Sequence, residues 1–457
     1  MTLDIIILAA GQGKRMYSGK PKVLHSVGPY ALLEHVYQTA RELSPDKIWV
    51  VHGHGSDQIL AAMPHLQVTW IEQPEQRGTG HAVSQVLPKL HNDGTVLILY
   101  GDVPLITVTT LHRLLAIGDP LTGRLNVLTV TLDEPHGYGR IIRNAAGEVT
   151  AIVEDKDASP AQRLIREVNT GILCTSATRL KQWVSQLHNE NSQQEYYLTD
   201  IIGMAVEDNV PIHTVMPDGC EEVMGVNNRT QLAILERAYQ RRQAQRLMAQ
   251  GVSLRDPERI DLRGEVIITG QDVEIDINVI LEGRIQLGQG VRIGPHVTLR
   301  DAHIGDHTEI LAYSLIEQAT VGSACRIGPF ARIRPDTTLA DQVHIGNFVE
   351  IKKTTIGTGS KVNHLSYIGD ARVGQKVNIG AGTITCNYDG VNKHQTVIED
   401  GAFIGSDTQL VAPVRVEQNA TIGAGSTITR DAPADALTLS RSGQKTIDGW
   451  KRPVKKV

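Results

Sequence analysis

The sequence predicts an α/β chain with two domains. We expect an N-terminal Rossmann-like domain with a mostly parallel sheet, a long linker helix, and a C-terminal left-handed parallel β-helix of hexapeptide repeats. Two observations predict this. In the first half, apolar strand-like runs alternate with helix-like segments, the rhythm of a parallel sheet covered by helices on both faces. In the second half, an aliphatic residue followed by Gly recurs at spacings near multiples of six, which indicates three-sided coils of about eighteen residues.

Length and composition fit two domains of a cytoplasmic protein. The 457 residues exceed one ordinary domain. The formal net charge of -5 argues against a nucleic-acid binder. No stretch approaches the roughly 20 apolar residues of a membrane span, and the start MTLDIIILAAGQGKR does not resemble a signal peptide. The four cysteines form no CxxC pair, so neither a disulfide framework nor a zinc site is indicated.

The first domain, residues 1–229, is expected to bind a ligand at the carboxyl ends of its strands. Strand-like runs occupy 5–10, 48–51, 96–100 and 125–130, and ligands of such folds gather where parallel strands end. The loop Gly11–Arg15 follows the first run, and its glycines would let backbone amides approach a phosphate. Asp102 follows the third run. It could hold Mg²⁺, which needs only one or two protein ligands besides phosphates; an ordinary helix cap is the alternative.

Residues 230–252 are predicted to form the linker helix, which Gly251 ends, and residues 253–457 the repeat domain. Only small and β-branched side chains stack inside a narrow prism, which explains the low aromatic content of 4%. A β-sandwich is the alternative, but it would alternate with period two. Ile379 and Ile404 are 25 residues apart, so a loop containing CNYDGVNKHQ is expected to interrupt the coils there.

The string LAAGxGxRM, followed by Pro-Lys-Val-Leu at 21–24, resembles the sugar-1-phosphate nucleotidyltransferases. The resemblance implies that Lys22 and Arg15 stabilise charge in the reaction and that Asp102 and Asn227 hold Mg²⁺. Gln73, Gly78 and Thr79 are implied to face uracil, and Gly139, Glu154 and Asn169 to contact the sugar. The implied UTP and UDP-sugar site is completed by strand-end and loop residues: Leu8, Ala9, Gly11, Gly13, Tyr100 and Gly101.

The second half carries the motifs FARIRP, GNFVEIKK, HLSYIGD, NIGAGTITCNYDG and IGSDTQLVAP. With QRGTGHA, YGDVPL and GVNNR upstream, the whole chain resembles the bacterial bifunctional N-acetylglucosamine-1-phosphate uridyltransferases and glucosamine-1-phosphate N-acetyltransferases. The resemblance implies acetylation of glucosamine-1-phosphate by acetyl-CoA. Transfer of UMP from UTP to N-acetylglucosamine-1-phosphate would follow, giving UDP-N-acetylglucosamine for peptidoglycan and lipopolysaccharide precursors. It also implies a homotrimer. Met224 departs from the pattern, since an acidic residue is expected before GVNNR.

His364 is the expected base of the acetyltransferase, because histidine can accept a proton near pH 7 and NHLSY resembles the catalytic segment of the family. Glu350 is a candidate to orient it. The resemblance further implies two sets of contacts. The sugar-phosphate set is Arg334, Glu350, Lys352, Tyr367 and Asn378, with Asn387 and Tyr388 of the inserted loop completing the pocket and reaching acetyl-CoA. The remaining acetyl-CoA set is Ala381, Ser406, Ala424 and Arg441.

Two alternatives remain open from the sequence. The β-helix could serve only assembly or regulation in a single-activity nucleotidyltransferase, although HLSY and CNYDG have no purely structural purpose. The chain could also be a non-catalytic scaffold or nucleotide-sugar sensor, although Lys22, Asp102 and His364 are all present.

Overall fold

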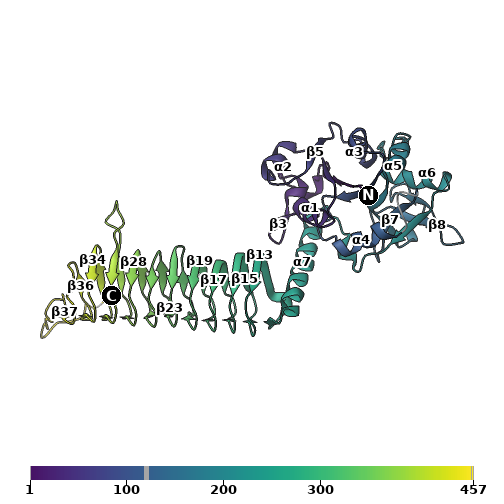
Figure 1. The fold of residues 1–457 in the computed structure, drawn as a ribbon. Helices are drawn as coiled ribbons and strands as arrows, with labels where there is room; N and C mark the ends of the chain where they lie inside the picture. Colours follow the sequence, from purple (N-terminus) through teal and green to yellow (C-terminus); the bar gives the residue numbers. More distant parts are fainter. Residues whose placement is uncertain (1, 118–122, 454, 456–457) are drawn as a thin grey trace. The chain divides into compact units, whose positions relative to one another are not determined.

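The computed structural model describes residues 2–117, 123–453 and 455. The chain divides into two compact units between Tyr239 and Gln240, and Figure 1 shows the secondary structure of each. Among the described helices, none is long and apolar enough to cross a membrane.

The first unit is built on a nine-stranded sheet whose main path runs β11-β7-β10-β6-β1-β4-β5. β1 pairs in parallel with β4 and β6, whereas β10 is antiparallel to β6 and β7. This confirms the predicted mostly parallel α/β sheet. Its strands are β1 (Thr2–Leu8), β4 (Lys47–His52), β5 (Thr69–Glu72), β6 (Gly94–Tyr100), β7 (Leu125–Thr131), β8 (Arg140–Arg143), β9 (Val149–Val153), β10 (Glu167–Ser176) and β11 (Ile212–Val215); β2 (Ser26–Val27) and β3 (Tyr30–Ala31) form a separate pair.

Both faces of this sheet are buried. Along β1, Ile5 and Ile7 belong to one apolar cluster and Ile6 and Leu8 to another, as alternation along a strand requires. A strand covered on both faces reads as a continuous apolar run, which explains IIIL. The helices of the unit are α1 (Leu32–Glu42), α2 (Ser56–Ala62), α3 (Thr79–Ser84), α4 (Val108–Ala116), α5 (Ala177–Val184) and α6 (Ile201–Glu207).

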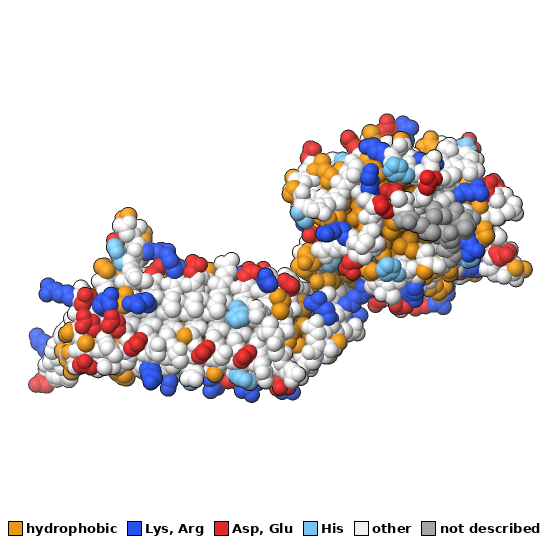
Figure 2. All heavy atoms as spheres, viewed as in Figure 1, with side chains coloured by type: hydrophobic (Ala, Val, Ile, Leu, Met, Phe, Trp, Pro, Cys, Tyr) orange, Lys and Arg blue, Asp and Glu red, His pale blue; other side chains and the backbone are white. Residues whose placement is uncertain are grey.

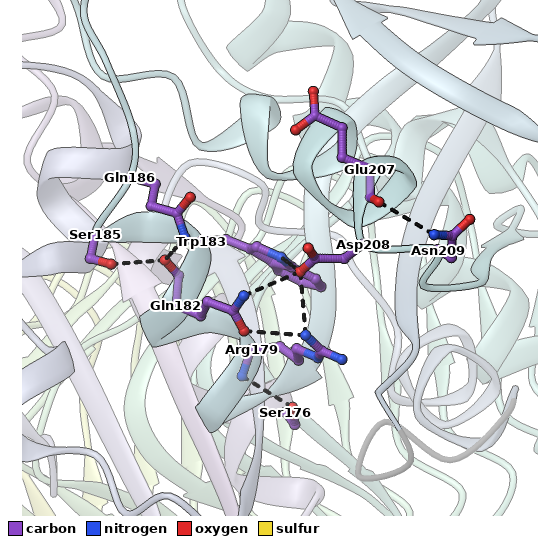
Figure 3. Close-up of polar contacts among 9 residues, drawn as sticks. All are labelled: Ser176, Arg179, Gln182, Trp183, Ser185, Gln186, Glu207, Asp208 and Asn209. Carbon is purple, nitrogen blue, oxygen red and sulfur yellow. Dashed lines mark hydrogen bonds and ion pairs between the residues drawn. The ribbon is translucent and has the colours of Figure 1, made fainter.

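A polar contact joins α5 to the end of α6 (Figure 3). Asp208 Oδ2 accepts hydrogen bonds from Trp183 Nε1 at 2.9 Å and from Arg179 NH1 at 3.3 Å. Trp183 is almost fully buried, so its indole N–H requires a partner. The contact therefore fixes these two helices against the sheet.

Helix α7 (Arg229–Ala249) contributes to a different apolar cluster in each unit. Leu235 and Ala238 join the cluster of Met16 and Val226 in the first unit. Ala244 and Leu247 belong to the core of the second unit. Gly251 follows with a positive φ of 91°, and its N–H bonds to the Met248 carbonyl at 2.9 Å. The helix thus ends at a glycine in the left-handed region.

The second unit is a parallel β-helix, which confirms the predicted repeat architecture. Its strands form three columns in two sheets (Figure 1). The first column is β12 (Ser253–Leu254), β14 (Glu274–Ile275), β16 (Arg292–Ile293), β18 (Glu309–Ile310), β20 (Arg326–Ile327), β23 (His344–Asn347), β26 (Lys361–His364), β29 (Asn378–Ile379), β32 (Phe403–Ile404), β35 (Thr421–Ile422) and β37 (Leu437–Thr438).

The other two columns share the second sheet, because its first four strands are long enough to follow the chain into both. These are β13 (Ile260–Ile268), β15 (Val279–Leu287), β17 (Thr298–Ile304) and β19 (Leu315–Val321). One column continues with β21 (Arg332–Ile333), β24 (Glu350–Lys352), β27 (Tyr367–Gly369), β30 (Ile384–Cys386), β33 (Gln409–Val411) and β36 (Thr427–Ile428). The other continues with β22 (Thr337–Leu339), β25 (Thr355–Ile356), β28 (Ala371–Val373), β31 (Thr396–Ile398) and β34 (Val414–Val416).

At several aliphatic-Gly pairs, among them Gly305, Gly346 and Gly357, the glycine lies where the backbones of successive coils approach closely. A Cβ added at Gly346 would lie 1.9 Å from the backbone oxygen of Asn363, one coil further on. Backbone cannot yield to such a contact as a side-chain tip could. The recurring glycines are therefore required by the contact between coils.

Four aromatic rings stack along one corner of the β-helix. His296, Tyr313, Phe330 and Phe348 occur in successive coils, and their ring centroids are 4.8, 5.0 and 5.3 Å apart. Each has a positive φ. The same corner position is held by Leu365 one coil later and then by Gly382, because Leu365 N–H bonds to Asn347 O and Gly382 N–H to His364 O. The stack therefore ends beside His364.

The inserted loop between β30 and β31 projects from the surface of the β-helix (Figure 2). Tyr388 and Lys393 form an isolated antiparallel bridge across it, and Asp389 accepts hydrogen bonds from the backbone of Val391 and Asn392. Val391 at its tip is 83% exposed. β29 and β32 still pair in register through Ile379 and Ile404, so the insertion leaves the stacking of coils intact.

Candidate functional sites

Lys22, Asp102 and Asn227 meet at the carboxyl edge of the first sheet. Lys22 Nζ donates to Asp102 Oδ2 at 2.5 Å and to Asn227 Oδ1 at 3.1 Å. The ion pair is largely shielded, with 12% and 16% of the two side chains exposed. Gly13 makes the approach of Lys22 possible, because it has a φ of 60° and its Cβ would lie 2.7 Å from Lys22 Cβ. The glycine loop and the Pro-Lys motif thus pack directly against each other.

The two oxygens that bind the Lys22 ammonium suit a small hard cation. Both Asp102 Oδ2 and Asn227 Oδ1 converge on one positively charged atom, and Mg²⁺ prefers such oxygen ligands. No group of three or more His, Cys, Asp or Glu side chains that could hold a metal exists among the described residues.

Met224 lies in an apolar cluster close to this place. Its side chain packs against the apolar cluster of Met16, Leu105 and Val226. The backbone beside it is nevertheless close to the site, since Val226 N–H bonds to the Asp102 carbonyl at 2.9 Å. The residue that departs from the family pattern therefore has an apolar packing role here.

Tyr100, Gly139, Glu154 and Asn169 surround a second part of the same edge. Asn169 N–H bonds to Gly139 O at 2.8 Å, and a Cβ on Gly139 would lie 3.4 Å from Glu154 Oε1. Burial raises the pKa of Glu154. Burial, and then the charges of Glu154 and Asp102, raise the pKa of Tyr100 well above its usual range. The predicted sugar residues are therefore brought together, next to Asp102.

A bulge in β10 shapes this region. The register of β10 against β7 shifts between Asn169 and Leu173. Gly171, within the bulge, has a φ of 84°, and a Cβ there would lie 2.4 Å from the Tyr100 ring. The glycine of the Asn-Thr-Gly motif is therefore needed for the close approach of Tyr100.

Thr199 is a site residue that the sequence analysis missed. Its hydroxyl donates to Glu154 Oε1 at 2.9 Å and lowers the pKa that burial raises. It lies in the short helical turn Leu198–Asp200, 45 positions from Glu154, in a segment without a recognisable motif. Only the folded structure brings the two together.

We predict that Thr199→Val moves the acid limb of uridylyl transfer to higher pH. Without the donated hydrogen bond the raised pKa of Glu154 rises further, so the carboxylate is protonated at a higher pH as the pH falls. At pH 6 the KM for N-acetylglucosamine-1-phosphate should increase about three- to tenfold, the effect of one net hydrogen bond. Thr199→Ser keeps the donor and should keep the wild-type pH profile. Identical pH profiles of Thr199→Val and Thr199→Ser would contradict a role of the Thr199 hydroxyl in setting the pKa of Glu154.

Other residues predicted for this site lie at the end of β1, on the glycine loop and at the end of β6. Leu8 and Ala9 are buried at the end of β1, whereas Gly11 and Arg15 are exposed on the loop. Gly101 N–H bonds to Leu8 O at 2.9 Å, which joins the ends of β6 and β1. Arg15 is thus exposed on the loop, whereas the Lys22 ion pair is shielded.

In the second unit, His364 is exposed and contacts Asn347 of the preceding coil. Its Nδ1 lies 2.8 Å from Asn347 Oδ1, and β23 and β26 pair these two residues directly. An amide oxygen only accepts hydrogen bonds, so Nδ1 carries the proton and Nε2 keeps its lone pair. The sequence analysis named Glu350 for the orienting role. In the structure Glu350 Oε1 instead accepts from Arg334 NH1 at 2.7 Å.

Positive side chains gather near Tyr367 and the inserted loop. The hydrogen bond and positive charge of Lys352 lower the pKa of Lys393, so two ammonium groups lie close together. Asn387 Nδ2 donates to Asp370 Oδ2 at 2.6 Å and lies 3.4 Å from the Tyr367 hydroxyl. Lys393, which the sequence analysis did not single out, therefore belongs with the predicted sugar-phosphate residues. Tyr388, one position beyond Asn387, is 60% exposed on the loop.

Three predicted acetyl-CoA residues continue the corner position of His364. Backbone hydrogen bonds link successive coils there, from Gly382 to His364, from Asp407 to Ala381 and from Gly425 to Ser406. Arg441 NH1 donates to the carbonyl of Ala424 at 3.0 Å. Asn378 lies one coil after Lys361 in the column that carries His364. The predicted base and the residues Ala381, Ser406 and Ala424 thus form one line along the corner of the β-helix.

Comparison with known proteins agrees with both halves. The MobA-like NTP transferase domain family matches residues 5–169, the GMPPB C-terminal domain family residues 262–345, and the bacterial transferase hexapeptide (six repeats) family residues 395–430. The bifunctional protein GlmU of Methylococcus capsulatus is 60% identical over 455 residues, covering 100% of this chain and 98% of that protein. The bifunctional protein GlmU of Azoarcus sp. is 58% identical, covering 99% of this chain and 100% of that protein. The bifunctional protein GlmU of Nitrosospira multiformis is 57% identical, covering 99% of this chain and 98% of that protein.

The fold and the two sites define a transferase with a nucleotidyltransferase half and a hexapeptide-repeat half. Full-length identity of this level shows more. The chain belongs to the family of the bifunctional protein GlmU. The predicted pair of activities, N-acetylglucosamine-1-phosphate uridyltransferase and glucosamine-1-phosphate N-acetyltransferase, is thereby confirmed, and the scaffold and single-activity alternatives are set aside.

Proposed function

We propose that the two sites work in sequence, with domains 1–229 and 253–457 each carrying one reaction. The site at His364 acetylates glucosamine-1-phosphate, and the site at Lys22 and Asp102 converts the product to UDP-N-acetylglucosamine. The observation that supports this is the grouping of predicted residues at two separate places, one in each unit. Free cysteines at all four positions are consistent with the cytoplasm, where both co-substrates are available.

For uridylyl transfer, the phosphate oxygen of the sugar attacks the α-phosphorus of UTP in line, and pyrophosphate leaves. Lys22 supplies a shielded positive charge, and Arg15 on the loop adds a second at the phosphates. Asp102 and Asn227 would hold Mg²⁺, which neutralises the charge that develops on the phosphate oxygens when it is bound. Glu154 and Asn169 position the sugar.

For acetyl transfer, the amine of glucosamine-1-phosphate attacks the thioester carbon of acetyl-CoA. The C–N bond forms, the C–S bond breaks, and coenzyme A leaves as its thiolate. Nε2 of His364 accepts the proton that the amine loses, since Asn347 keeps the other ring proton on Nδ1. Arg334, Lys352 and Lys393 bind the phosphate, while Tyr367, Asn378 and Asn387 contact the sugar. Coenzyme A lies along Ala381, Ser406 and Ala424 toward Arg441.

Removal of Asn347's acceptor is predicted to slow acetyl transfer. In Asn347→Leu nothing holds the proton on Nδ1, so kcat should fall about ten- to hundredfold, the usual effect of losing a group that orients a functional histidine, while the KM for acetyl-CoA changes little. Asn347→Asp keeps an oxygen in the same place and should be much less impaired. Release of the coenzyme A thiol measures both. An equal loss of kcat in Asn347→Leu and Asn347→Asp would show that Nδ1 of His364 needs no acceptor.

The functional assembly that we propose is a homotrimer, with the β-helices side by side. The exposed, parallel faces of a hexapeptide prism favour such packing, and loop 387–395 stands away from its own coils. Sedimentation equilibrium measures the mass directly. A single species at the monomer mass of 49.9 kDa would contradict the trimer.

A further inference from the structure

Gln73 is a buried amide at the base of the nucleotide site. Only 3% of the residue is exposed, and it directly follows β5, with its N–H bonded to His52 O at 2.8 Å. It lies close to the glycine loop, since Gln76 Nε2 is 3.4 Å from Gln73 O and Gln12 Nε2 is 3.4 Å from Gln76 Oε1. A polar group so fully enclosed has its hydrogen bonds fixed by its neighbours.

The orientation of the Gln73 amide follows from the carbonyl of Gly78. The side-chain nitrogen of Gln73 lies 3.1 Å from Gly78 O. A carbonyl only accepts hydrogen bonds, so the amide nitrogen and not its oxygen must face Gly78. The nitrogen has a second hydrogen, and His81 Nδ1 lies 3.1 Å from it. Both hydrogens of the amide are thereby used within the protein.

His81 is the group that accepts this second hydrogen. Its other ring nitrogen lies 3.2 Å from Gln85 Nε2, but the hydrogens of Gln85 have the His81 carbonyl and the Ser84 hydroxyl as acceptors, each at 3.1 Å. Gln85 therefore does not need a ring nitrogen of His81 as an acceptor, whereas the second amide hydrogen of Gln73 does. A ring that accepts from Gln73 at Nδ1 has its N–H at Nε2.

This arrangement leaves Oε1 of Gln73 as the atom that can meet a ligand, since no hydrogen bond to it is found among the described residues. The backbone N–H groups of Gly78 and Thr79 belong to the turn whose carbonyl holds the Gln73 amide nitrogen, and they are the donors that we assign to the base. An acceptor beside donors matches the N3–H and O4 of uracil. It mismatches cytosine, which presents an acceptor at N3 and an amino group at position 4.

We propose that His81 is a positioning residue for base selection, because it acts with the Gly78 carbonyl to hold the Gln73 amide with Oε1 toward the base and so strengthens the preference of the site for uracil over cytosine. This inference rests on the proposed uridylyl transfer and deepens it. His81 does not touch the reacting phosphates. It acts through Gln73, and its loss removes the acceptor that keeps one amide hydrogen away from the base.

The test compares His81→Leu with His81→Asn. Leucine fills the space but accepts no hydrogen bond, whereas asparagine can place its Oδ1 where the ring has Nδ1. The ratio of kcat/KM for UTP to that for CTP is measured with N-acetylglucosamine-1-phosphate and Mg²⁺. In His81→Leu the ratio should fall about tenfold, equivalent to ~1.4 kcal/mol of discrimination. In His81→Asn it should stay within about threefold of wild type, the range of one weak hydrogen bond.

Acetyl transfer by the same preparations, together with a melting curve, verifies that each variant is folded. A His81→Leu enzyme that loses activity equally with UTP and CTP would overturn the positioning role and make His81 a packing residue. So would an asparagine variant that behaves like the leucine one. If wild type transferred neither UMP nor CMP, the proposed uridylyl transfer itself would fail, which is a distinguishable result.

Discussion

Asp102→Ala is expected to lower uridylyl transfer by about 10³-fold, near the upper range for loss of one electrostatic contact to a transition state, and to leave acetyl transfer unchanged. The reason is the shielded contact between Lys22 Nζ and Asp102 Oδ2 at 2.5 Å. Without the carboxylate, the site loses one of two oxygen ligands for Mg²⁺, and the Lys22 ammonium loses its compensating charge. Pyrophosphate release measures the first activity and coenzyme A thiol release the second.

Asp102→Asn is the matched control, because it keeps an oxygen at the same position and removes only the charge. We expect it to retain more activity than Ala and to need more Mg²⁺ for half-maximal rate. Isothermal titration of Mn²⁺ in the presence of UTP gives a readout that is independent of turnover. Equal loss of both activities in a folded Asp102→Ala protein would contradict the two-site arrangement.

His364→Ala is expected to have the opposite selectivity, with acetyl transfer reduced by about 10²- to 10⁴-fold, the contribution of a general base. Uridylyl transfer should be unaffected. Mass spectrometry of a mixture containing glucosamine-1-phosphate, acetyl-CoA, UTP and Mg²⁺ separates the cases. Wild type should yield UDP-N-acetylglucosamine, and the variant should yield it only when N-acetylglucosamine-1-phosphate is supplied.

Leu365→Ala is the matched control for this experiment, since Leu365 is the exposed neighbour in the same corner of the coil. It should acetylate at close to the wild-type rate. If wild type used N-acetylglucosamine-1-phosphate but never acetylated the amine, His364 would have no role as a base.

The fold could be predicted from the sequence because its signals are local. A strand such as β1, buried on both faces, has an unbroken run of apolar residues. The coils of the β-helix are marked in the sequence by the recurring aliphatic-Gly pairs. The boundary between the two compact units is harder to predict from the sequence. This boundary in the chain falls within α7, whose residues belong to different apolar clusters, and the sequence of one helix does not show what each turn packs against.

The candidate sites were predicted in part for the same reason. Lys22, Asp102 and His364 lie in recognisable motifs. Thr199 lies in no motif. Asn347 and Lys393 stand in the strings GNFVEIKK and CNYDGVNKHQ, but their roles depend on contacts with another coil or loop, which the strings do not show. Glu350 illustrates the converse. The sequence analysis named Glu350 as a candidate to orient His364, but Glu350 Oε1 accepts from Arg334 NH1, and the register of β23 and β26 places Asn347 opposite His364.

The inserted loop at 387–395 has a consequence for how this domain can vary among relatives. Each coil stacks on the next through fixed partners, so one extra residue within a strand would displace every later side chain from its column. The loop avoids this penalty, since it leaves the prism after Cys386 and returns in register at Thr396. Changes of length should therefore be confined to its exposed tip around Val391, where a peptide tag or a fluorescent label would leave the coils aligned. Asn387 and Lys393 have to stay in place for the proposed substrate contacts.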